Sequence, residues 1–190
     1  MKNKVKIFTL LSLASNIIFC IYNVVVGILY RSWWMLTVGS YYVFLSAMRA
    51  FVIKSKSDGC FIRRTSGVML VFTVVPLVGT VILASIKDRG TKLQLIMMLA
   101  VAVYSFAKIV IAIVNLVKLR KVKSAKTVVL RNVSFADALV SIFSLQRSML
   151  VSFEGMSENG IRIMNIATGS GVCFLVILLG ANLFLSAKKD

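Results

Sequence analysis

The chain has 190 residues, 59% of them hydrophobic, and a mean hydropathy of +0.92. This balance is far more apolar than that of a soluble domain, so we expect a single transmembrane domain over residues 1–190. The sequence contains no histidine, which excludes a zinc, haem or general-base site that depends on imidazole.

The net charge of +17 comes from 23 Lys and Arg residues against six acidic residues. Most of these basic residues lie in short clusters between apolar runs, as they do in proteins that cross a membrane several times. We therefore expect the basic loops to contact anionic lipid headgroups, and we expect no nucleic-acid partner.

Six apolar runs, each close to the ~20 residues that a membrane-crossing helix needs, follow one another along the chain. They cover approximately residues 7–30, 33–53, 66–86, 93–117, 133–153 and 163–186. The sequence thus predicts an all-α membrane protein with six transmembrane helices. The first run has a basic leader but is longer than the core of a cleavable signal peptide, so an uncleaved first helix is expected.

Basic residues are divided unequally between the two sides that six spans would create. The N-terminus, the second and fourth connections and the C-terminus carry 15 of them, and the other side carries five. Because basic segments stay in the cytoplasm, both termini are predicted to be cytoplasmic, in the cell membrane. Helices 1–2 and 4–5 also share a late arginine, which suggests a 3+3 repeat that would be inverted.

Three basic residues fall inside the predicted spans, namely Arg49, Lys108 and Arg147. Charges at such depth face the interior of a helix bundle or extend along the helix to the interface. Arg49 lies about one turn from the cytoplasmic end of its span. We interpret it first as an anchor at that boundary and second as a cavity residue. Arg147 can lean outward toward Glu154, seven residues further along.

Lys108 lies deeper than the other two. It precedes Lys118 by ten residues, which is roughly 15 Å along a helix and close to the membrane midplane. A lysine side chain covers only part of that distance, so Lys108 is expected to face the bundle interior or a wet crevice. Asp137, one turn into the fifth span from the same side, is its predicted acidic partner. Tyr41, in the middle of the second span, either lines a polar pathway or packs with its hydroxyl on a carbonyl.

Two stretches carry short motifs. SNIIFCIYNVVVGILYRS contains Asn16 and a Gly-x4-Ser pattern formed by Gly27 and Ser32, and SFADALVSIFSLQ contains Ala136 and Asp137. In these features the chain resembles the membrane domain of the cation diffusion facilitator transporters. The resemblance implies six helices with both termini inside.

That family also has a pair of metal ligands on each of helices 2 and 5, a His or Asp followed four residues later by Asp. The matching positions here hold Tyr41, Leu45, Val140 and Ser144. None of them offers an imidazole or a carboxylate, so a divalent cation cannot be held there and zinc transport is not expected. We also expect no metal-binding domain after the sixth helix.

The sequence favours a small transporter-like protein whose interior is cationic. Arg49, Lys108 and Arg147 would repel cations in a medium of low dielectric constant, so the expected cargo is an anionic or neutral solute. Tyr41, Ser144 and Asp137 complete the candidate cavity residues. The alternative is a non-catalytic membrane subunit that docks against a partner membrane protein or a second copy. We expect no enzymatic activity, no metal and no cofactor.

Overall fold

A computed structural model describes residues 2–29, 31, 33–55, 58–86, 95–118, 124–152 and 157–187. Within these ranges every secondary-structure element is a helix, which confirms the predicted all-α class. The helices are α1 (Lys2–Leu29), α2 (Trp33–Lys54), α3 (Gly59–Phe72), α4 (Val74–Ile86), α5 (Leu95–Lys118), α6 (Ala125–Ser152) and α7 (Glu158–Ser186).

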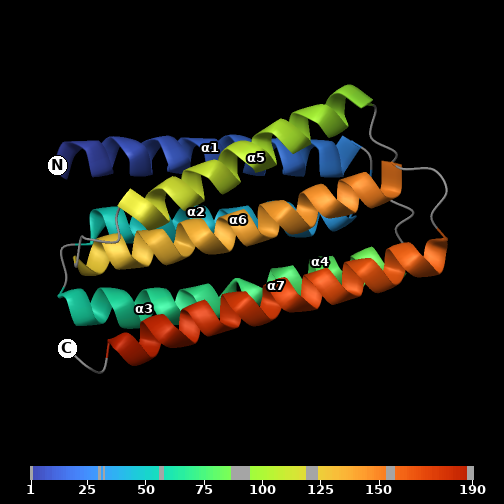
Figure 1. Ribbon diagram of the computed structural model, residues 1–190. Helices are drawn as coiled ribbons and strands as arrows, with labels where there is room; N and C mark the ends of the chain where they lie inside the picture. Colours follow the sequence, from blue (N-terminus) through green and yellow to red (C-terminus); the bar gives the residue numbers. More distant parts are fainter. Residues whose placement is uncertain are drawn as a thin grey trace.

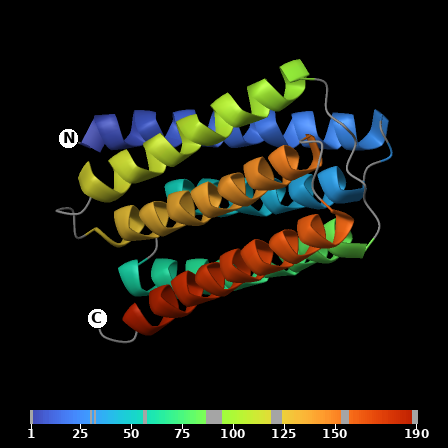
Figure 2. The ribbon, with the colours of Figure 1, turned by 45° about the vertical axis from the view of Figure 1, so that its right-hand side comes forward.

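The helices run lengthwise in one up-and-down bundle (Figure 1). α2 and α6 lie at its centre, α1 and α5 cover one side, and α3, α4 and α7 form the other, as the turned view also shows (Figure 2). The start of α1 and the end of α7 lie at the same end of the bundle in both views. We call this end, which also holds the end of α2 and the start of α3, the terminal end.

Five helical stretches are long and apolar enough to cross a bilayer within the described residues. They are Ser12–Leu29, Trp33–Lys54, Gly59–Ser85, Ala125–Leu150 and Glu158–Ser186. In α5 the apolar stretch found is shorter, Ala102–Ile111. The fourth predicted span therefore stays a prediction, as do the inverted repeat and the cytoplasmic position of the termini.

The third span consists of two helices rather than the single run predicted for residues 66–86. α3 ends at Phe72 and α4 begins at Val74, with Thr73 between them. Pro76 explains the interruption, because proline has no N–H and its ring clashes with the carbonyl four residues earlier, which is that of Phe72. α3 and α4 continue in the same direction, so the break leaves one crossing (Figure 1).

The third span and α6 begin earlier than the apolar runs indicated, as α1 and α7 also do. The third span begins at Gly59 and α6 begins at Ala125, so basic residues that we assigned to connections lie on helices. These residues are Arg63, Arg64, Lys126 and Arg131. Hydrophobicity predicts only the part of a helix inside the hydrocarbon, whereas the helix itself extends into the interface, where long basic side chains reach water.

Glycines allow α7 to approach α3 and α4 closely. A Cβ added at Gly67 of α3 would lie 2.9 Å from the carbonyl oxygen of Gly180. A Cβ at Gly169 would lie 2.5 Å from a methyl carbon of Val81 in α4, whereas a Cβ at Gly171 would meet nothing within 4 Å. Small residues are the usual means of close helix packing in membranes, and here they fix α7 against the third span.

Candidate functional site

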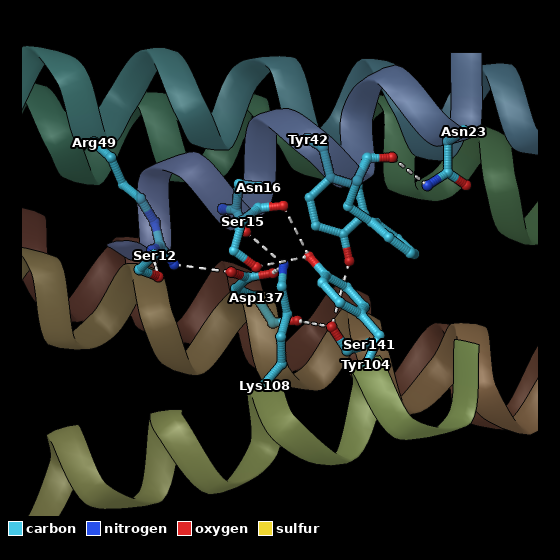
Figure 3. A network of polar contacts seen from close by, with 11 residues as sticks. Ser12, Ser15, Asn16, Asn23, Tyr42, Arg49, Tyr104, Lys108, Asp137 and Ser141 are labelled. Carbon is cyan, nitrogen blue, oxygen red and sulfur yellow. Dashed lines mark hydrogen bonds and ion pairs between the residues drawn. The ribbon is translucent and has the colours of Figure 1, made fainter. Parts of the chain in front are cut away.

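Asp137 of α6 lies inside the bundle with 3% of its surface exposed, and its two carboxylate oxygens contact two different cations. Arg49 Nη2 of α2 donates to Oδ2 at 2.8 Å, and Lys108 Nζ of α5 donates to Oδ1 at 2.6 Å. Figure 3 shows both side chains directed at the carboxylate from opposite sides. The predicted contact between Lys108 and Asp137 is confirmed.

The Arg49 side chain is directed into the bundle and not along α2 toward its end, so its interpretation as a boundary anchor is wrong. Its side chain is 2% exposed, and besides Asp137 it donates through Nη1 to Ser12 Oγ of α1. Arg49 follows Tyr42 by seven residues, or about two helical turns, so both lie on the face of α2 that packs inward. That face meets Asp137 of α6, and the ion pair with its carboxylate balances the arginine charge. The side chain therefore does not need to reach water.

The Lys108 ammonium group is enclosed by an acid, an amide and three aromatic rings. Besides Asp137, its Nζ donates to Asn16 Oδ1 of α1. The nitrogen lies 4.4 Å from the centre of the Tyr42 ring, 4.9 Å from Tyr104 and 5.8 Å from Phe19. All three distances are within the ~6 Å range of cation–π attraction. We call Asp137, Asn16 and these three rings the ammonium cage.

Further hydrogen bonds join the cage to its surroundings. The hydroxyls of Tyr42 and Ser141 lie 3.3 Å apart, and Ser141 Oγ also donates to the carbonyl oxygen of Asp137 at 2.8 Å. Tyr104 donates to the carbonyl oxygen of Ser15 at 3.3 Å. Through these contacts α1, α2, α5 and α6 all meet at one polar network inside the bundle (Figure 3).

Arg147 is also buried, in the half of α6 away from the terminal end. Its exposed fraction is 2%, and its guanidinium carbon lies 4.7 Å from the centre of the Trp34 ring. The side chain therefore packs inside the bundle, close to the end where α2 begins, and its outward direction stays a prediction. Glu154, its expected partner, lies outside the described residues.

Trp34 also lines a small pocket near that half of the bundle. The pocket is bounded mainly by aromatic and small polar side chains, namely those of Phe19, Tyr22, Asn23, Trp34, Met35, Ser144 and Ser148. Ser144 is thus the one predicted cavity residue that borders this space. Phe19 borders the pocket and the ammonium cage alike, so the two sites are adjacent.

The four positions that the family resemblance assigns to metal ligands are all buried in α2 and α6. Tyr41, Leu45, Val140 and Ser144 offer no carboxylate, and Tyr41 packs edge-on against Tyr42 with ring centres 5.6 Å apart. Its hydroxyl has no hydrogen-bond partner in the part of the chain that the structure describes. Among the described residues no three Cys, Asp or Glu side chains gather as a metal site would require.

Sequence reasoning missed the contribution of α1. Ser12, Asn16, Phe19 and Asn23 follow one another at intervals of four, three and four residues, which places them on one helical face. Ser12 and Asn16 contact the two cations, and Asn23 reaches the pocket. The signal was present as a polar stripe in an apolar helix.

Comparison with known proteins identifies no relative, because no family model, curated protein or solved structure matches this chain. The resemblance to cation diffusion facilitators therefore stays a hypothesis based on the residues given above.

Proposed function

We propose that this protein is a small multi-pass membrane carrier for an anionic or neutral solute, and that it does not transport zinc. The observation that carries the proposal is that two buried cations share one buried carboxylate. Arg49 and Lys108 together exceed the charge of Asp137 by one. In a medium of low dielectric constant this surplus repels cations and attracts anions.

The arrangement of polar groups supports a route to this charge. Asn23 and Ser144 are among the residues that line the pocket beside Trp34, and Phe19 links this pocket to the cage around Lys108. We propose that this pocket is the outer part of the transport path.

We further propose six spans in the cell membrane, with the terminal end in the cytoplasm. Basic residues on the described helices gather at that end, among them Lys54, Arg64 and Lys126, where they would contact anionic headgroups. A scaffold shared with cation diffusion facilitators, including an inverted repeat, is part of the same proposal.

Flux measurements on purified protein in liposomes test the function. We expect anions or neutral solutes from a panel of halides and small carboxylates to move faster than through protein-free liposomes, and monovalent cations not to. Lys108→Met should abolish the flux, and Ser170→Ala, on an exposed position of α7, should leave it unchanged. Absence of any flux above background, or full flux in Lys108→Met, would contradict the proposal.

The alternative proposal is a non-catalytic subunit that binds a partner membrane protein or a second copy. The near-complete burial of Arg49, Asp137 and Lys108 favours it, because a network closed to solvent can hold helices together without any solute. Extraction in a mild detergent followed by mass measurement separates the two. A stoichiometric partner together with absence of flux supports the subunit, and an active chain or homodimer supports the carrier.

A further inference from the structure

We infer that the ammonium cage is a binding site for a primary ammonium group, which the chain fills with its own Lys108, and that a small primary alkylammonium ion binds there when this side chain is removed. The inference concerns a ligand site and does not depend on whether the protein transports anything.

The contacts of Lys108 Nζ match the chemistry of a primary ammonium ion. Such a group has three N–H donors and no acceptor. One donates to Asp137 Oδ1 at 2.6 Å and another to Asn16 Oδ1, and the Tyr42 ring, 4.4 Å from the nitrogen, faces the remaining side. A quaternary ammonium ion lacks N–H groups and would leave both oxygens without a donor, so the cage selects for primary ammonium.

The cage is built largely without the helix that supplies the cation. Asn16 and Phe19 belong to α1, Tyr42 to α2 and Asp137 to α6, whereas Lys108 belongs to α5. Of the five groups that surround the ammonium, only Tyr104 shares its helix. Besides its packing along α6, α5 thus inserts one cation into a site that the other three helices largely form.

The charge balance allows the site to survive without its lysine. Arg49 occupies Oδ2 of Asp137 and is held in addition by Ser12, so removal of Lys108 leaves a neutral ion pair with Oδ1 still available. Lys108→Ala deletes three methylene groups and the ammonium, which together correspond to n-propylammonium. In the wild type the tethered lysine has a high effective concentration and excludes a free amine, so the site must be tested in the variant.

The experiment is a thermal-stability measurement on purified Lys108→Ala in detergent, with chloride salts at matched ionic strength. We expect n-propylammonium to raise the melting temperature in a saturable way, and sodium and tetramethylammonium not to. A ligand at nine times its Kd shifts the ratio of folded to unfolded protein about tenfold. The wild type should not respond, nor should Lys108→Met, whose side chain fills the space. Lys108→Ala combined with Asp137→Asn should lose the response.

Two results would overturn the inference. One is a Lys108→Ala protein that n-propylammonium does not stabilise more than sodium does. The other is an equal response in the variant that also carries Asp137→Asn. Should Lys108→Ala fail to fold when extracted alone, extraction in n-propylammonium is expected to recover a monodisperse protein, and failure to recover it counts equally against the site.

Discussion

The charge imbalance around Asp137 predicts that removal of the carboxylate and removal of the Lys108 ammonium group change stability unequally. Asp137→Asn removes the carboxylate that both cations contact, so Arg49 and Lys108 stay buried and lose the counter-charge that they share. Lys108→Met instead removes the surplus charge and leaves the 2.8 Å pair of Arg49 and Asp137 intact. We therefore expect the first change to be much more destabilising than the second.

The magnitudes follow from the burial of the groups. Loss of one partner of a buried ion pair destabilises a protein by about 3–5 kcal/mol, and here Asp137 is the partner of two cations, so Asp137→Asn should reach at least that range. Methionine resembles lysine in volume and suits an aromatic surrounding, so Lys108→Met should cost less than about 1.5 kcal/mol. A gap of about 3 kcal/mol is roughly a hundredfold difference in the unfolding equilibrium.

A titration with sodium dodecyl sulfate in mixed micelles, followed by circular dichroism, measures these differences. The double variant gives the sharpest test, because Asp137→Asn with Lys108→Met leaves one unpaired cation where the single Asp137→Asn leaves two. The double variant should thus be more stable than the Asp137 single variant, which is a strongly non-additive result. Equal loss from the two single changes, or a double variant less stable than Asp137→Asn, would refute the charge-balance reasoning.

Three other predictions follow from separate parts of the bundle. Gly67→Ala places a methyl group against the backbone of α7 and should destabilise the protein by about 1–3 kcal/mol, whereas Gly171→Ala, which meets nothing within 4 Å, should be neutral in the same titration. Arg147→Met should cost about 0.5–2 kcal/mol through its contact with Trp34, and a smaller loss is expected when Trp34 is already leucine; equal losses would exclude a cation–π contribution. Cys60 is exposed at the terminal end, so a membrane-impermeant thiol reagent should label it only after cells are permeabilised; labelling of intact cells would reverse the proposed orientation.

Depth along a helix could be predicted from the sequence, but the direction of a side chain could not. Lys108 was assigned to the interior because no lysine reaches water from about 15 Å, and that reasoning uses only helix geometry. For Arg49 the same count of residues to the helix end allowed its side chain to reach the interface. That prediction failed because Asp137, on another helix, lies where it can pair with Arg49 inside the bundle. Tertiary packing decides which faces of α2 and α6 meet, and the hydropathy of the sequence does not predict that packing.

The positions of the helix ends were also predicted only in part from the sequence. The apolar runs located the parts of the helices inside the hydrocarbon, but α6 begins at Ala125, well before the run that starts near residue 133. α7 begins at Glu158, where Ser157 accepts a hydrogen bond from the backbone N–H of Gly160. Such capping is readable from sequence, yet it was outweighed by the search for apolar residues.

Stability alone does not account for the second cation on Asp137. One arginine already neutralises the carboxylate, and replacing buried ionic groups with apolar residues of similar volume is often neutral or stabilising. A bundle selected only to fold would therefore do as well with methionine at position 108. A lysine there makes sense if its charge acts on something that enters the bundle. Measurement of stability and flux on the same Lys108→Met protein decides this, because intact folding with lost flux separates the role of the charge from the role of the packing.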